Sequence, residues 1–370
     1  MDDIFRFSDR YGPKMIVGVH DPKAGLKGVV VVDNVARGPA IGGTRMAPDV
    51  SLEECFRLAR AMTFKNAAAN LPHGGAKSVI VADPRMPLDD KEKLFRAFAR
   101  AIRDIADYTP GPDMGTNEIC MAWIKDEIGR AIGLPEEIGG IPLDEIGATG
   151  LGLVAAIDVA KDYCGLDLNG ATVVIQGFGS VGKHTARLLG EKGAVLVGVC
   201  DIGGAISDPD GLDLDRLLAL QAAGKSVIEY GGRVEDKDAI VDVACDIWVP
   251  AARPDVITAD NVNRLKTRLV PQGANIPMSM EIEKILHDRG VLVLPDFIAN
   301  AGGVICGAVE YRGGTREEAK AIIVETVSDN IRTILEKVND TKILPREAAV
   351  MLARRRLLEA METPDIVRAA

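Results

Sequence analysis

The stretch that most constrains the fold runs from Ala171 to Asp201, with the sequence ATVVIQGFGSVGKHTARLLGEKGAVLVGVCD. An apolar, β-branched segment, Val173 to Ile175, leads into three glycines, and an amphipathic segment beginning near Val181 follows them. A strand that turns through glycines into a helix is typical of a dinucleotide-binding unit. Further apolar runs at 246–250, 269–271 and 291–295, separated by helical patterns, predict an α/β fold with a parallel, doubly wound sheet.

Each of the three glycines has a steric role in such a turn. Gly177 permits the tight turn, Gly179 lets backbone N–H groups approach a pyrophosphate, and Gly182 lets the helix pack closely on its strand. A second strand ends at Asp201, 19 residues after Gly182, where a carboxylate can accept hydrogen bonds from ribose hydroxyls. The stretch therefore predicts a dinucleotide site and favours NAD over NADP. The alternative is a glycine-rich turn that serves packing alone.

Length and composition limit the class of protein. A chain of 370 residues with 47% hydrophobic residues is large enough for two domains. No apolar run reaches the roughly 18–20 residues that cross a bilayer, and no secretory signal is visible, so we expect a cytoplasmic protein without a membrane partner. A net charge of −10 argues against a nucleic-acid partner. The dispersed cysteines and histidines have no metal-ligand spacing, so we expect no metal site.

The segments before the glycine turn predict a first sheet with its own helices. Two β-branched runs between Met15 and Asp33 indicate paired strands, and Ser51 with Glu54 forms a capping-box pattern for a helix ending near Ala69. We expect a second helix over about 88–106. We expect a loop at HGGAK (73–77) followed by a short apolar strand, SVIVAD (78–83), and a second loop at TPGPDMGTNE (109–118). We assign no regular element to the glycine-rich RGPAIGGTR (37–45).

Glycine and proline in GGIPLDE (139–145) indicate a crossing between domains. We therefore expect a substrate-binding and oligomerisation domain over 1–143 and a Rossmann-type NAD-binding domain over 144–330. The helices of 331–370 are expected to return to the first domain.

Seven motifs extend the interpretation to nearly the whole chain: MTFKNAAANLPHGGAK, GPDMGTNE, GATGLG, GFGSVG, PAARPDVIT, GAN and PDFIANAGGV. In these motifs the chain resembles the glutamate/leucine/phenylalanine/valine dehydrogenase family. The resemblance implies a substrate-binding domain and a dinucleotide-binding domain with a catalytic cleft between them. It also implies NAD-dependent oxidative deamination of an L-amino acid to a 2-oxo acid and ammonia, and a homo-oligomer.

The resemblance assigns the chemistry to three residues. Lys65 would bind the substrate α-carboxylate, Lys77 would activate water against an imine carbon, and Asp113 would act as general acid and base on the amino nitrogen. Without the motifs, Lys65 would be an ordinary solvated helix lysine and Asp113 a turn residue.

The residues expected to line the substrate pocket favour an apolar side chain. Ile41 stands where glutamate-specific relatives place a lysine, and Gly111 and Gly307 leave room for a side chain larger than that of valine, unless Met62 or Met114 refills it. The motifs are closest to those of leucine and phenylalanine dehydrogenases. The full set of expected substrate contacts is Lys65, Ile41, Gly42, Met62, Gly111, Asn275, Val304 and Gly307.

The resemblance also implies the cofactor contacts. Thr149 and Asn300 would bond the nicotinamide carboxamide and ribose, and Asn275 would border both substrate and cofactor. The full expected set is Thr149, Gly177, Phe178, Gly179, Ser180, Val181, Gly182, Asp201, Ile202, Ala251, Ala252, Asn275 and Asn300.

Three alternatives remain open: a glutamate dehydrogenase, a non-catalytic dinucleotide-binding regulator, and a 2-hydroxy-acid dehydrogenase. Retention of Lys65, Lys77 and Asp113 argues against the regulator. No Arg/His pair in a matching motif supports the hydroxy-acid enzyme.

Overall fold

The computed structural model describes residues 2–363, and contacts divide the chain into two compact units. Of the described residues, unit 1 comprises 2–142, 304–319 and 352–363, and unit 2 comprises 143–303 and 320–351. The chain first passes between them in the GGIPLDE segment. Towards its end the division differs from a simple return of 331–370, because three helices contribute residues to both units: α10 (Gly302–Tyr311), α11 (Arg316–Thr341) and α12 (Pro345–Glu362).

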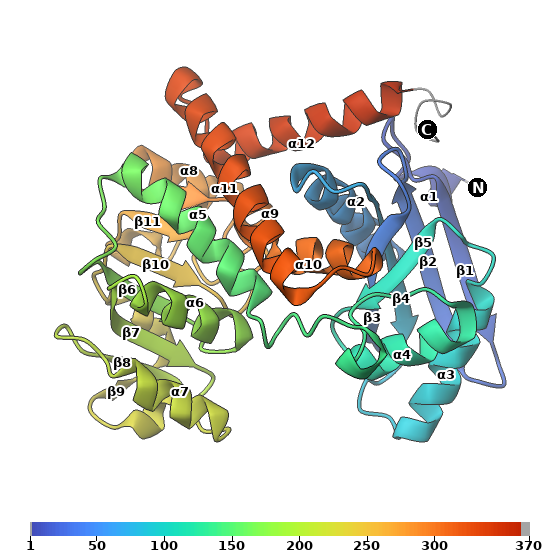
Figure 1. Ribbon diagram of the computed structural model, residues 1–370, viewed down its shortest axis with the longest axis horizontal. Coiled ribbons are helices and arrows are strands. Elements are labelled where there is room, and N and C mark those ends of the chain that lie inside the picture. Colours follow the sequence, from blue (N-terminus) through green and yellow to red (C-terminus); the bar gives the residue numbers. More distant parts are fainter. Residues whose placement is uncertain (1, 364–370) are drawn as a thin grey trace. The chain divides into compact units, whose positions relative to one another are not determined.

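The sheet of unit 1 has five strands in the order β1-β2-β4-β3-β5 (Figure 1). They are β1 (Met15–Asp21), β2 (Leu26–Asn34), β3 (Ala40–Ala47), β4 (Gly74–Val81) and β5 (Tyr108–Pro112). The pairs β1–β2 and β2–β4 are antiparallel, whereas β3 runs parallel to both β4 and β5.

Three of these strands cover segments for which the sequence predicts loops or no regular element. RGPAIGGTR contains β3, HGGAK contains the start of β4, and TPGPD contains the end of β5. Glycine and proline are depleted in strands, which is why propensity misses them. Tertiary pairing overrides that weak local signal, since β4 is hydrogen-bonded to β2 on one side and β3 on the other.

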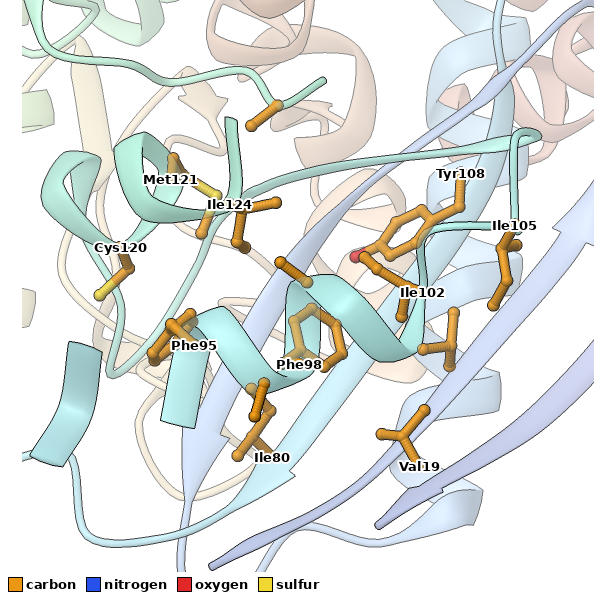
Figure 2. Packing of buried hydrophobic residues seen from close by; sticks show 14 of the residues in the cluster. Val19, Ile80, Phe95, Phe98, Ile102, Ile105, Tyr108, Cys120, Met121 and Ile124 are labelled. Atoms are coloured by element: carbon orange, nitrogen blue, oxygen red, sulfur yellow. The ribbon is translucent and has the colours of Figure 1, made fainter. Parts of the chain in front are cut away.

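Helices cover both faces of this sheet. Unit 1 contains α1 (Asp2–Phe5), α2 (Leu52–Ala68), α3 (Leu88–Ala101), α4 (Glu118–Ile128) and the 3-10 turn η1 (Glu136–Ile138). On one face, Cys55 and Ala59 of α2 pack against Val31 and Val79. On the other, α3 and α4 bury a larger cluster that includes Phe95, Phe98, Ile102, Tyr108 and Ile124 (Figure 2). The Ser51 hydroxyl caps α2 by accepting the Glu54 N–H at 3.1 Å, as the sequence predicts.

The helix expected over about 88–106 ends earlier, at Ala101. The Arg130 guanidinium donates to the carbonyl oxygens of Ile102 and Ile105 at 2.9 Å each. These bonds satisfy carbonyls that a longer helix would have used internally, so they stop α3 one turn short.

The sheet of unit 2 has seven strands in the order β12-β11-β10-β6-β7-β8-β9. Figure 1 labels those from β11 to β9. The seven strands are β6 (Thr172–Gln176), β7 (Val195–Asp201), β8 (Gly204–Ser207), β9 (Val234–Glu235), β10 (Ile247–Pro250), β11 (Leu269–Pro271) and β12 (Leu292–Leu294). The strands from β12 to β7 are all parallel to one another. At the other edge, β8 pairs antiparallel with β7, and β9 pairs antiparallel with β8. The five strands predicted from the sequence, β6, β7, β10, β11 and β12, are parallel as expected. The antiparallel edge is an addition that the sequence does not predict: only Ile202 and Gly203 join β7 to β8, and a parallel pair needs a longer crossover.

The helices of unit 2 are α5 (Ala148–Cys164), α6 (Ser180–Gly190), α7 (Leu214–Ala222), α8 (Met280–Asp288) and α9 (Asp296–Ala299). Three 3-10 turns lie between strands, η2 (Val227–Tyr230), η3 (Lys237–Asp242) and η4 (Val262–Arg264). Trp248 is fully buried in the core, where its indole N–H donates to the Ile240 carbonyl at 3.3 Å. Among residues 2–363, no helix is both long and apolar enough to span a membrane.

Because α2 lies so close to β4, we expect the stability of the protein to depend on glycine at position 75. A Cβ at Gly75 would stand 2.0 Å from the Thr63 backbone nitrogen, whereas a Cβ at Gly18 of β1 meets nothing within 4 Å. Gly75→Ala should therefore lower the free energy of unfolding by about 1–3 kcal/mol or more, and the matched Gly18→Ala should not lower it. Denaturant unfolding of both variants measures this; equal stabilities would contradict the packing described for α2.

Candidate functional site

The candidate catalytic side chains share one face of the unit 1 sheet, because side chains alternate between faces along a strand. On β4, Val79 packs in the cluster with α2 and Ile80 in the cluster with α3, so Lys77 lies on the α2 face. On β3, Met46 packs in the cluster with α3, and Arg45 therefore also lies on the α2 face.

Lys77, Asp113 and Arg45 form a cluster of charges on this face. The Lys77 ammonium is in ion-pair contact with Asp113 Oδ2, and Arg45 Nε donates to the same oxygen over 3.2 Å. Arg45 also pairs with Glu54 of α2, with 2.6 Å between Nη1 and Oε1. The Lys77 side chain is only 7% exposed and that of Asp113 22%. One carboxylate thus lies between two cations in a largely desolvated place.

The position of Asp113 determines its ionisation. Burial raises its pKa, but the charge and hydrogen bond of Lys77 and the charge of Arg45 outweigh burial and hold the pKa below its usual value. The carboxylate is therefore ionised at neutral pH and can accept a proton. The Asp113 N–H donates to Thr116 Oγ1 at 2.8 Å, and Thr116 Oγ1 donates to the Thr44 carbonyl at 2.9 Å, which fixes the loop after β5 against β3.

Two glycines of β3 leave the space that this cluster needs. A Cβ at Gly43 would lie 2.8 Å from Asp113 Cβ and 3.1 Å from Lys77 Nζ, so a larger residue would obstruct the ion pair. A Cβ at Gly42 would lie 1.6 Å from the Ala76 carbonyl oxygen, so glycine also permits the close pairing of β3 with β4.

Lys65 lies in the last turn of α2 and is half-buried, as is Met62 three residues before it. Residues so spaced share one side of a helix. The Asn66 side chain donates to the Gly74 carbonyl at 2.7 Å and so ties this end of α2 to the start of β4. The helix that carries Lys65 is thereby fixed to the strand that carries Lys77.

The predicted pocket residues Ile41, Gly111 and Gly307 are buried in unit 1 together with Ile132. A Cβ at Gly111 would lie 3.1 Å from Ile132 Cγ1, and one at Gly307 would lie 2.8 Å from Ile132 Cδ1. Ile132 thus occupies the space beside both glycines. The expectation that the glycines leave room for a bulkier substrate is corrected for this reason, and Met114, 55% exposed, is not the residue that fills the space.

Glu310 of α10 holds the segment around Ile132. It lies one turn after Gly307, and its carboxylate accepts the N–H groups of Leu134 at 3.1 Å and Ile141 at 3.0 Å. Burial raises the pKa of Glu310. The helix that carries Gly307 is therefore bonded to the segment that supplies the Ile132 side chain.

In unit 2, the three glycines of GFGSVG occupy the places that their steric roles require. Gly177, after β6, has φ of 102°, a conformation that favours glycine. A Cβ at Gly182 would lie 2.0 Å from the Gly177 carbonyl oxygen, which requires glycine for close helix–strand packing. A Cβ at Gly179 would meet nothing within 4 Å, so the N-terminus of α6 is open to a phosphate there.

This turn lies at the topological switch point of the sheet, where ligands of such folds bind. The strand β6 is flanked by β7 on one side and β10 on the other, so the chain reverses its direction across the sheet between them. The Ala251 N–H donates to the Gln176 carbonyl at 2.8 Å. A Cβ at Gly177 would lie 2.5 Å from the Ala252 Cβ, so the ends of β6 and β10 meet at the glycine turn.

Asp201 ends β7, and its carboxylate is already engaged within the chain. Oδ1 accepts from Ser226 Oγ at 2.7 Å and from the Gly203 N–H at 2.8 Å, and Oδ2 accepts from the Val227 N–H at 2.8 Å. A carboxylate has about four acceptor positions, so one on Oδ2 is left for a ribose hydroxyl. The neighbouring Ile202, also among the predicted cofactor contacts, is 98% exposed.

The first turn of α5 carries Thr149, which is half-buried. A Cβ at Gly302 would lie 1.9 Å from the Ala148 carbonyl oxygen, so the glycines of ANAGG let that segment approach the start of α5. Asn300 Nδ2 donates to Asn275 Oδ1 at 2.8 Å and to the Gly273 carbonyl at 3.2 Å. Two of the three predicted nicotinamide-side residues are thus directly bonded.

The predicted residues fall into two sets, one in each unit. Unit 1 holds Ile41, Gly42, Met62, Lys65, Lys77, Gly111, Asp113, Val304 and Gly307. Unit 2 holds Thr149, Gly177, Phe178, Gly179, Ser180, Val181, Gly182, Asp201, Ile202, Ala251, Ala252, Asn275 and Asn300. In the described part of the chain, no His, Cys, Asp or Glu side chains gather into a group of three that could hold a metal ion.

Sequence reasoning misses Arg45, Ile132 and Ser226. Arg45 could have been found, because assigning RGPAIGGTR as a strand puts it on the same face as Ile41. Ile132 and Ser226 carry no local signal, since each reaches its partners only through the folded chain.

Comparison with known proteins bears on the identity of both units. A sequence model described as "Glutamate/Leucine/Phenylalanine/Valine dehydrogenase" matches residues 139–364. A second, described as "Glu/Leu/Phe/Val dehydrogenase, dimerisation domain", matches residues 13–130.

Curated relatives match most of the chain. The NADP-specific glutamate dehydrogenase of Saccharolobus shibatae is 36% identical over 359 residues, which cover 90% of this chain and 84% of that protein. The NAD-specific glutamate dehydrogenase of Staphylococcus aureus is 37% identical over 346 residues, which cover 88% of this chain and 83% of that protein.

Solved structures agree with the fold. A hetero-hexameric glutamate dehydrogenase from Thermus thermophilus, in a Leu-bound form, aligns with a TM-score of 0.83 and 30% identity over 94% of this chain and 89% of that one. An L-tryptophan dehydrogenase from Nostoc punctiforme aligns with a TM-score of 0.76 and 25% identity over 98% of this chain and 99% of that one. These matches, with the motifs in place on the two units, establish that the chain belongs to the glutamate/leucine/phenylalanine/valine dehydrogenase family.

Proposed function

We propose that this protein is an NAD-dependent dehydrogenase that deaminates an L-amino acid with an apolar side chain to the 2-oxo acid and ammonia, reversibly. The pocket carries this proposal. Ile41 and Ile132, both buried in unit 1, offer an apolar wall where a substrate carboxylate would need a cation. Burying a carboxylate without a partner costs several kcal/mol, whereas burying an aliphatic side chain contributes about 1.5–3 kcal/mol.

The charged residues of unit 1 have distinct roles in this reaction. Lys65 binds the α-carboxylate as a point charge. Asp113, ionised beside Lys77 and Arg45, accepts a proton from the substrate ammonium and later returns protons to the departing nitrogen. Lys77 directs water to the Cα carbon once the imine has formed, and its contact with Asp113 gives the proton a direct route between the two groups.

The residues of unit 2 fit NAD. The open helix N-terminus at Gly179 suits a pyrophosphate, and the remaining acceptor position of Asp201 suits a ribose hydroxyl. Bound NAD supplies the acceptor for the hydride that leaves Cα. The Asp201 carboxylate repels the 2′-phosphate of NADP, which supports NAD as the preferred cofactor.

A glutamate dehydrogenase is the second candidate, favoured by the names of the two curated relatives.

The family model for residues 13–130 is named a dimerisation domain, and the Thermus protein is a hexamer. We therefore also propose that this chain forms a homo-oligomer.

A substrate panel tests the proposal. Initial rates of NADH and NADPH formation should be measured with leucine, valine, phenylalanine, glutamate and lactate. With NAD, we expect kcat/KM for leucine to exceed that for glutamate by about 100-fold or more, because the pocket leaves a second carboxylate unpaired. A higher kcat/KM for glutamate than for the other amino acids would contradict the apolar pocket. If none of the amino acids is turned over, the proposal that the protein is an amino-acid dehydrogenase is refuted.

If Ile132 limits the size of the substrate side chain, replacing it should change the preference between large and small substrates. Ile132→Ala should raise the ratio of kcat/KM for phenylalanine to that for leucine about tenfold or more, because it opens the space beside Gly111 and Gly307. Ile128→Ala removes the same atoms from the edge of the α3 and α4 cluster and serves as the matched control. An unchanged ratio in Ile132→Ala would show that this side chain does not limit the pocket.

The two lysines should separate kinetically. Lys77→Ala should lower kcat about 10²–10⁴-fold, whereas Lys65→Ala should chiefly raise KM for the amino acid. Lys93→Ala, which removes an exposed lysine paired with Asp90, is the control and should behave as wild type. A normal kcat/KM in either test variant would refute the role proposed for that lysine.

A further inference from the structure

A buried ionic network lies at the carboxyl ends of β11 and β12 in unit 2. Arg346, in the first turn of α12, donates from Nε to both carboxylate oxygens of Glu283 at 2.8 Å. Its Nη2 donates to Asp296 Oδ1 at 2.9 Å and to Gln272 Oε1 at 2.9 Å. The side chains of Arg346, Glu283 and Asp296 are 15%, 5% and 7% exposed. None of these residues belongs to the predicted site.

The second oxygen of Asp296 leads from this network to the cofactor side. Asp296 Oδ2 accepts the N–H of Ile276 at 2.8 Å. The Asp296 backbone carbonyl accepts the N–H of Asn300, also at 2.8 Å. Asn300 in turn donates from Nδ2 to Asn275 Oδ1. Asp296 is therefore bonded to Asn300 and to the residue that follows Asn275.

Ile276 has a backbone conformation that its side chain disfavours. Within the described residues, four non-glycine residues have positive φ, and Ile276, at 50°, is the only β-branched one. A β-branched residue at positive φ is an outlier, and the following Pro277 also favours an extended conformation at this position. The Asp296 carboxylate accepts the Ile276 N–H, and the Ile276 carbonyl accepts the Asp255 N–H at 3.0 Å. Such conformations persist where surrounding contacts fix them, often at ligand sites.

The geometry points to a positioning role for the Arg346–Asp296 pair. By fixing Asp296, Arg346 keeps Ile276 in the left-handed conformation, and this orients the preceding Asn275 towards Asn300 for cofactor binding. If Asp296 released the Ile276 N–H, residue 276 would relax to an extended conformation and turn Asn275 away. The inference rests on the proposed function, because it requires a nicotinamide cofactor at these asparagines.

A double-mutant cycle between Asp296 and Ile276 tests this role. Asp296→Asn keeps the shape of the side chain, but its amide cannot accept from both Arg346 and the Ile276 N–H. Ile276→Gly lets residue 276 adopt positive φ without strain. The dissociation constant of NADH, measured by fluorescence titration, should rise at least about tenfold for Asp296→Asn in the wild-type background. In the Ile276→Gly background the same substitution should change it less than about threefold.

Glu283→Gln is the matched control. It changes a buried carboxylate bonded to the same Arg346 without touching Ile276. We expect it to lower the thermal midpoint as Asp296→Asn does while changing the NADH dissociation constant less than about threefold. If Asp296→Asn does not fold, Arg346→Lys replaces it in the same cycle, since it keeps the charge but loses the planar guanidinium, whose Nε and Nη2 donate to Glu283 and Asp296 in a fixed geometry.

The outcomes separate the two proposals. Equal effects of Asp296→Asn in both Ile276 backgrounds, or an equally large effect of Glu283→Gln, would overturn the positioning role. Failure of the wild-type protein to bind NADH or NADPH would refute the proposed function instead.

Discussion

The ion pair between Lys77 and Asp113 is the interaction on which the arrangement of unit 1 depends. Both side chains are largely desolvated, and removing one partner of such a pair typically costs about 3–5 kcal/mol because the other charge remains buried. Arg45 adds a second cation to the same carboxylate oxygen. Gly43 must stay small for the pair to form across β3. The contact between two charged side chains thus requires glycine at position 43 on the strand beside them.

The parts of the fold that could be predicted from sequence are those in which the residues that act together are also close together in the chain. The glycine turn at Gly177 is predictable because strand, turn, helix and terminal acid are contiguous, so every role can be assigned from local spacing. The strand β3 and the start of β4 are not, because their glycines serve close approach between strands and helix and suppress the local strand signal. The local sequence therefore predicts a loop at Lys77, although this residue lies on a central strand.

Side-chain pockets are a harder case, since they are formed by residues distant in sequence. Gly111 and Gly307 suggest open space when they are considered alone, but Ile132 fills that space from a third segment. Asp201 is comparable: the motif predicts its place at the end of β7, whereas its bonds to Ser226 and Val227 depend on a distant turn. In both cases the residue type was predictable and its partners were not.

If the buried pair acts as one catalytic unit, its members should not contribute independently to the rate. The most direct measurement is a double-mutant cycle of Lys77→Met and Asp113→Asn on kcat/KM for the preferred amino acid. We expect the double variant to lose about as much activity as the worse single variant. Losses that multiply would contradict it, because Lys77 and Asp113 would then act separately.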